Sequence, residues 1–342
     1  MKPRIAKTTR RILWLTLVLF FAAVFSAAAQ PKVLGVGAIG LTVADMDRSV
    51  QFFSQVLTFK KVADVEFHDP QFDRLTGIFG ARVRIATMKL GEETITLTEY
   101  LNPPGRPIPW DSRSNDRWFQ HIAIVVRDMD VAYARLRRFK VKPISTAPQR
   151  IPDWNQAAAG IRAFYFRDPD NHALELIYFP PCKGDPRWQR PTEALFLGID
   201  HTAIAVGNTE QSLKFYRDLL GLKVAGESLN YGMEQEYLSR VAGARVRITG
   251  LRAPEGPGIE FLEYLHPQDG RPYPQDAGPN DLWNWQTNLL VQDLGDFFNR
   301  LKSHNVSLIS PKVFDIKSMG RGVKKAALIR DPDGHALGLV ER

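Results

Sequence analysis

The chain has 342 residues, of which 44% are hydrophobic and 24% charged, so it can bury a core and is not an intrinsically disordered protein. Its only cysteine, Cys182, excludes an internal disulfide. The net charge of +8 overstates how basic the folded part is, because residues 1–29 hold five of the 45 basic residues and no acid. The remaining 40 basic and 37 acidic residues leave a charge of +3, which gives no argument for a nucleic-acid partner.

The first 29 residues have the three regions of a signal peptide. Residues 1–11 are basic, residues 12–25 are apolar, and a Ser-Ala-Ala-Ala series precedes Gln30. We expect cleavage near Gln30 and a periplasmic or secreted protein without a membrane partner, which the intact mass of the exported protein would check. An uncleaved membrane anchor is the alternative, because the apolar run approaches the length of a span. The pair Arg10-Arg11 leaves export by a twin-arginine route open.

The rest of the chain contains an internal repeat with a spacing of about 163 residues. The matching segments are residues 80–85 and 243–248, residues 99–103 and 263–267, and residues 167–174 and 330–337. The repeat predicts two duplicated domains, residues 35–180 and 196–342. The Pro-rich stretch between them predicts a linker at residues 181–195.

Each half divides again, because a strand followed by a helix opens two segments in it. Residues 199–206 alternate polar and apolar side chains, as in a half-buried strand, and apolar residues at helical spacing follow. The four such openings are residues 39–57, 121–139, 199–220 and 287–301. Since β-rich sequence follows each opening, we predict an α+β fold of four βαβββ modules, with curved mixed sheets around a cleft.

Three motifs carry a family resemblance. They are a first strand with His-x4-Val, a Ser-x2-Phe-Tyr helix that ends in Leu-Gly, and an Asp-Pro-Asp turn followed by Leu-Glu-Leu. With these motifs the sequence resembles the vicinal-oxygen-chelate (VOC) superfamily, which includes glyoxalase I, bleomycin-resistance proteins, extradiol dioxygenases and methylmalonyl-CoA epimerase. The resemblance implies the fold and leaves the reaction open, because one fold hosts many chemistries.

The resemblance also implies where metal ligands lie, since a module of this superfamily typically offers one residue from its first strand and one carboxylate from a later strand. Module two offers His121 and Glu175, and module three offers His201 and Glu260. The corresponding residues of modules one and four are weak ligands or none: Ala38, Thr96, Gln286 and Gly338.

In fused glyoxalase I proteins module two pairs with three, and module one with four. The resemblance therefore implies a single two-His, two-Glu site for one divalent ion (Zn, Ni, Co, Mn or Fe) and a second cleft without ligands. Because one chain supplies both module pairs, a monomer suffices.

Such a site suits a small-molecule substrate that chelates the metal through neighbouring oxygens. By resemblance to glyoxalase I, Glu175 or Glu260 is the catalytic base, with Glu175 preferred for its Leu-Glu-Leu context, in isomerase or lyase chemistry next to a carbonyl. Glutathione is disfavoured as a co-substrate, because Ala205 and Tyr264 replace the Arg and Asn that contact it in glyoxalase I proteins.

Four aromatic residues precede first strands and predict either an aromatic-lined substrate pocket or hydrophobic core: Trp118, Phe119, Trp283 and Trp285. Two other functions stay open. His121, His201 and one Glu could hold ferrous iron in a dioxygenase. The second open function is that of a metal-free binding protein of bleomycin-resistance type. Metal content and oxygen uptake with catechols would separate these possibilities.

Overall fold

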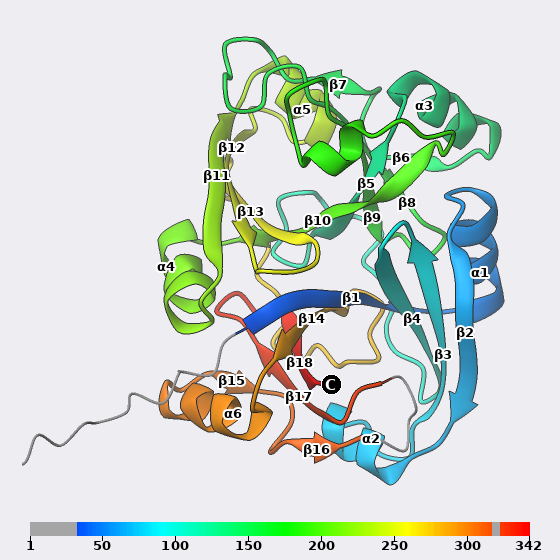
Figure 1. Ribbon diagram of the computed structural model, residues 1–342, viewed down its shortest axis with the longest axis vertical. Coiled ribbons are helices and arrows are strands. Elements are labelled where there is room, and N and C mark those ends of the chain that lie inside the picture. The colour runs from blue at the N-terminus through cyan, green and yellow to red at the C-terminus, as the bar shows by residue number, and fades with distance from the viewer. Residues whose placement is uncertain (1–32, 317–321) are drawn as a thin grey trace, which may run out of the picture. The chain divides into compact units, whose positions relative to one another are not determined.

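All four predicted strand-then-helix openings are present in the computed structural model, which describes residues 33–316 and 322–342 (Figure 1). The predicted signal peptide, residues 1–29, lies outside the described residues, so cleavage and export stay predictions. Within the described part of the chain, each helix is too short or too polar to cross a bilayer.

The modules have the following elements. Module one contains β1 (Val33–Val43), α1 (Met46–Gln55), β2 (Lys60–Phe67), α2 (Pro70–Thr76), β3 (Arg82–Leu90) and β4 (Glu93–Asn102). Module two contains β5 (Gln120–Val126), α3 (Met129–Arg138), β6 (Lys142–Pro143), β7 (Gln149–Arg150), β8 (Arg162–Arg167) and β9 (Ala173–Tyr178). Module three contains β10 (Phe196–Val206), α4 (Thr209–Leu213) with a π-helical continuation (Lys214–Leu219), β11 (Lys223–Asn230), α5 (Met233–Ser239), β12 (Arg245–Arg252) and β13 (Gly258–His266). Module four contains β14 (Trp285–Val291), α6 (Leu294–Ser303), β15 (Ser307–Leu308), β16 (Phe314–Asp315), β17 (Lys325–Arg330) and β18 (Ala336–Glu341).

The modules pair across the duplication, as predicted. One sheet has the strand order β15-β17-β18-β14-β1-β4-β3-β2, and the other β11-β12-β13-β10-β5-β9-β8-β6. In Figure 1, β1 in blue therefore lies beside β14 in orange, and β18 in red is the next strand beyond β14. In each sheet the two first strands run antiparallel, and each has the last long strand of its own module as a parallel neighbour.

Strand alternation gives each sheet one face toward a core and one toward a cleft. On β1, Ile39 and Leu41 belong to a buried cluster that also contains Ile122 and Ile124 of β5. This core therefore joins modules one and two, whereas each sheet joins modules of different halves. The domain boundaries at residues 180 and 196 stay predictions, because the halves share both sheets.

The predicted linker packs against the fold. A 3-10 helix (Pro186–Gln189) lies within it, and Trp188 is buried there. The Trp188 Nε1 donates to Asp200 Oδ1 at 3.0 Å, and Arg187 pairs with Glu93 of β4 at 2.6 Å. This segment thereby contacts β10 directly beside a predicted ligand, His201.

Arginine side chains clamp the two halves together. Arg106 donates to both carboxylate oxygens of Asp281 at 3.0 and 2.7 Å, and its guanidinium lies 4.9 Å from the centre of the Trp283 ring. Arg271 makes the same contacts at the repeat-related positions: it donates to both carboxylate oxygens of Asp116, and its guanidinium lies over the Trp118 ring. Bidentate pairing satisfies carboxylates that are almost fully withdrawn from water.

Two buried histidines also join the halves. His172 Nδ1 lies 2.7 Å from Asp168 Oδ2, and its Nε2 lies 2.7 Å from the carbonyl oxygen of Leu282. His335 makes the equivalent contacts, with Nε2 2.7 Å from the carbonyl oxygen of Arg117. Each ring faces two acceptors and can satisfy both only as an imidazolium, which donates from both nitrogens.

We expect the stabilising effect of His172 to decrease as the pH rises. Burial lowers its pKa, but the charge of Asp168, its hydrogen bond and the charge of Asp170 outweigh this and raise the pKa above 6.5. A raised folded-state pKa contributes stability below the ordinary value that is lost as the pH rises through the folded-state value. Urea unfolding should show the largest free-energy difference between wild type and His172→Gln at pH 6 and a smaller one at pH 9. A difference that grows with pH would contradict the imidazolium.

Candidate metal centre

The register of the second sheet brings the predicted ligands together. His201 of β10 lies opposite Ala123 of β5, two residues from His121. Glu175 of β9 lies opposite the same Ala123, and Glu260 of β13 lies opposite the residue two places after His201. Residues that face one another across strands share a face of the sheet, so all four side chains emerge on one side.

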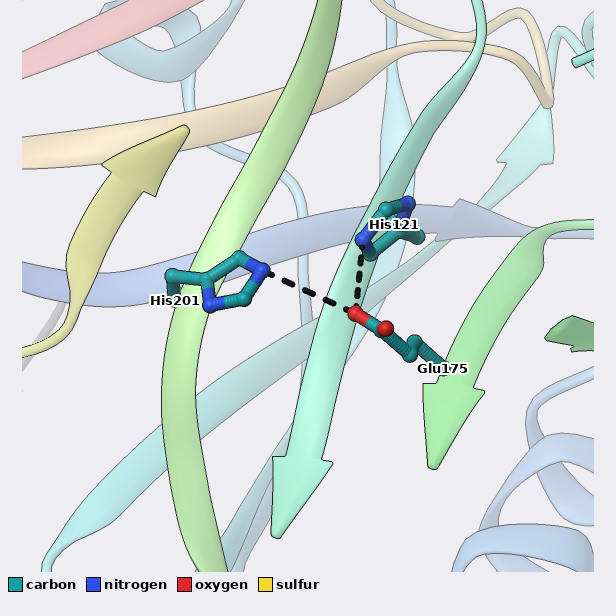
Figure 2. A group of neighbouring side chains, drawn as sticks. All are labelled: His121, Glu175 and His201. Atoms are coloured by element: carbon teal, nitrogen blue, oxygen red, sulfur yellow. Dashed lines mark ion pairs between the residues drawn. The ribbon is translucent and has the colours of Figure 1, made fainter. Parts of the chain in front are cut away.

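The side chains converge on the Glu175 carboxylate. Glu175 Oε2 lies 3.0 Å from His121 Nε2 and 3.6 Å from His201 Nε2, the two contacts drawn in Figure 2. Glu260 Oε1 lies 3.5 Å from His201 Nε2. His121 is completely buried, and Glu175 and His201 are nearly so. The structure thus brings three of the four predicted ligands, His121, Glu175 and His201, within 4.8 Å of one another, and Glu260 adjoins them through His201. Their role as ligands stays a prediction.

This donor set fits a divalent metal ion. Among the described residues, neither His121 Nε2 nor His201 Nε2 forms a hydrogen bond, although both atoms are buried and lie 3.0–3.6 Å from carboxylate oxygens. Buried nitrogens that lie beside carboxylates without forming hydrogen bonds call for an explanation, and metal coordination would supply one. Ligand atoms bound at roughly 2.0–2.2 Å lie about 3.0–3.6 Å apart, which matches the separations here. Imidazole with carboxylate is a donor set that Zn, Ni, Co, Mn and Fe accept.

Asp200 orients His201 and was missed by the sequence analysis. Its Oδ2 lies 3.0 Å from His201 Nδ1, which directs Nε2 toward Glu175 and Glu260. Arg252 donates to both Asp200 oxygens at 2.9 Å, and Trp188 adds a third bond. Such carboxylate partners fix the orientation of metal-binding histidines. The signal in the sequence was the Asp-His pair itself, which occurs in module three and not before His121.

Burial and neighbouring charges act in opposite directions on the pKa values of His201 and Asp200. Burial lowers the pKa of His201, but the negative charge of Glu260 and the hydrogen bond that His201 donates to Asp200 outweigh it and raise the pKa to about 9. Burial raises the pKa of Asp200, but hydrogen bonding and the charge of His201 reverse this and hold the pKa well below its usual range. Burial raises the pKa of Glu260.

The two glutamates differ in access to solvent. A cavity of about 230 Å³ reaches the cluster and is lined by Asp200, His201, Arg252 and Glu260 but not by Glu175. The Glu260 side chain is 22% exposed, and the Glu175 side chain is 6% exposed. A substrate in this cavity would therefore meet Glu260 first, which differs from the sequence-based preference for Glu175 as the base.

The four aromatic residues pack in hydrophobic clusters. Trp118 and Trp283 lie under the arginine clamps, and Trp285 belongs to the core of modules one and two. Phe119 lies edge-on to the His121 ring, with 5.6 Å between centroids. None of the four lines the cavity beside His201. Their placement agrees with the core alternative, and contact with a substrate stays a prediction.

Comparisons with known proteins agree with this architecture. The family model described as Glyoxalase/Bleomycin resistance protein/Dioxygenase superfamily matches residues 35–176 and again residues 198–339. The 2-epi-5-epi-valiolone epimerase of an Actinomyces species is 33% identical over 156 residues, which are 44% of this chain and 82% of the epimerase.

Two solved structures share the fold over most of the chain. A mutant of glyoxalase I from Zea mays has a TM-score of 0.59 at 17% identity, with 91% of this chain and 92% of the maize chain covered. A Bacillus subtilis protein described provisionally as a dioxygenase has a TM-score of 0.55 at 16% identity, with 91% and 86% covered. At these identities the likeness is one of fold alone.

Proposed function

This chain belongs to the glyoxalase/bleomycin resistance protein/dioxygenase superfamily, and from that premise we propose that it is a metal-dependent isomerase. The proposed reaction moves a proton at the carbon next to a carbonyl in a small molecule with two neighbouring oxygens. The observation that carries the proposal is the convergence of His121, His201 and Glu175, with Glu260 facing the adjoining cavity. Export of this enzyme remains the prediction made from residues 1–29.

In the proposed reaction, His121, Glu175 and His201 would hold the metal ion, and Glu260 would provide a fourth ligand. When bound, the ion supplies a Lewis acid that polarises the carbonyl oxygen. Glu260 takes the proton from the adjacent carbon and returns it to the substrate, so that atoms and charge balance over the cycle. The similarity to an epimerase supports this reaction class, because an epimerase inverts one carbon centre.

The surroundings of the site support a substrate other than glutathione. Ala205 and Tyr264, which replace the two residues that contact glutathione in glyoxalase I proteins, are both buried and neither lines the cavity. The cavity lining instead combines Arg252 and Glu227 with three glycines and with alanine, isoleucine and leucine side chains. The volume of about 230 Å³ lies below the roughly 300–1,000 Å³ of pockets for drug-sized ligands, which favours a compact substrate.

Proton exchange tests the proposal without knowledge of the natural substrate. Metal-loaded protein is incubated with 2-hydroxycyclohexanone in D2O, and proton NMR follows the loss of the C–H signal next to the carbonyl. We expect exchange at least about 100-fold faster than in buffer with the same metal, the scale of general base catalysis. Cyclohexanone, which lacks the second oxygen, should exchange much more slowly. Exchange at the buffer rate with each of the five metals would contradict the proposal.

A further inference from the structure

The cleft of the first sheet, built from modules one and four, holds a larger cavity than the candidate metal centre. Its volume is about 430 Å³, within the range of small-molecule sites. Its apolar walls come from a buried cluster that includes Phe72, Leu75, Ile85 and Leu328. Of the described residues that line it, only Arg342 carries a formal charge.

Amide side chains occupy the place that the metal ligands have in the other sheet. Gln286 Nε2 donates to Asn288 Oδ1 at 2.7 Å, and Asn288 Nδ2 donates to the carbonyl oxygen of Ala38 at 2.7 Å. Gly338, which replaces the counterpart of Glu175, is needed for this arrangement, because a Cβ there would overlap the Asn288 side-chain oxygen. The floor of this cleft is thus an ordered polar surface without titratable groups.

One polar atom beside this floor lacks a partner. Asn284 lines the cavity and is only 6% exposed, and within the described part of the chain its Oδ1 has no hydrogen-bond partner. A buried unpaired acceptor destabilises a protein unless something else donates to it. The other polar groups around the cavity are hydroxyls and amides, such as Thr96 and Gln286.

We propose that this cavity is a second binding site, which takes an uncharged small molecule with an apolar body and a hydroxyl or N–H group that donates to Asn284 Oδ1. Charge selects against anions and chelating acids, because the described residues of the walls include no buried cation and no histidine, cysteine or carboxylate side chain. The site is independent of the proposed metal centre, since the two lie in different sheets. Its ligand class also differs from that of a chelating substrate.

Calorimetry with a neutral probe tests the site. The probe is 4-hydroxyacetophenone at pH 6.5, and the comparison compound is 4-methoxyacetophenone, which has no donor. Asn284→Leu should weaken binding of the hydroxyl compound about tenfold and leave the methoxy compound unaffected. The same variant should unfold at the wild-type temperature or above, because it removes an unpaired buried acceptor. If Asn284 had only a structural role, the Asn284→Leu variant would not combine weaker binding of the hydroxyl compound with unchanged thermal stability.

Two further variants locate the probe. Thr96→Phe, which fills the cavity from its floor, should abolish binding of both compounds. His121→Ala, in the other sheet, should leave binding unchanged. Loss of binding in His121→Ala would place the probe at the metal centre and overturn the proposal. Absence of binding to the wild-type chain up to the solubility limit of the probe would also overturn it.

Discussion

Replacing His121 with alanine should reduce metal affinity by more than the roughly 10–100-fold that loss of an outer-shell partner causes. The reason is that His121 Nε2 lies 3.0 Å from Glu175 in a fully buried cluster, where no other described side chain can take its place. His201→Ala should damage the same site. The double variant should be little worse than either single one, because residues that act on one ion are not additive. Mass spectrometry under native conditions and titration with a metal indicator measure both quantities.

His304→Ala is the matched control for this experiment. His304 is exposed at the end of α6 and contacts the carbonyl oxygen of Arg300, so its loss should leave metal binding unchanged. Wild-type protein should bind one equivalent of metal per chain, because the described residues at the equivalent positions of the other sheet are Ala38, Thr96, Gln286 and Gly338. Two equivalents, or wild-type affinity in His121→Ala, would show that the ion is held elsewhere.

Replacing Glu260 with glutamine should reduce proton exchange by at least about 100-fold, the usual contribution of a general base. Metal binding should largely persist, because His121, Glu175 and His201 still form a three-residue cluster. Glutamine keeps the size of the side chain and a coordinating oxygen but cannot accept the proton as a carboxylate does. Exchange of 2-hydroxycyclohexanone in D2O and metal content, measured on the same preparation, separate the two effects.

Glu175→Gln is the matched comparison, since both variants change one carboxylate to an amide within the same cluster. Glu175 contacts both histidines and does not line the cavity, so this variant should lose metal affinity and, with it, exchange. If Glu175→Gln keeps its metal but loses exchange, while Glu260→Gln exchanges normally, then Glu175 is the base that the sequence context favoured.

Much of the architecture could be predicted because the chain repeats itself. The recurrence of residues 80–85 at 243–248 marks a duplication without any knowledge of the structure, and the alternation within each first strand indicates which side chains share a face. Ile122 and Ile124 point into a core, so His121 has to point the other way. The pairing of modules two and three came from a family resemblance, and the register between β5 and β10 confirms it.

The sequence by itself therefore determined the modules, because the repeat and the strand period depend on residue identity. The positions of the four candidate ligands came from the family resemblance, and the lack of ligands in the other cleft stays a prediction. Only the tertiary structure decided that Asp200 orients His201, that Glu260 rather than Glu175 borders the cavity, and that arginines from the opposite half cover Trp118 and Trp283. Those features arise from contacts between residues distant in the chain, and periodicity carries no information about such distances. The unpaired Asn284 oxygen is the clearest case, since its isolation depends on every side chain packed around it.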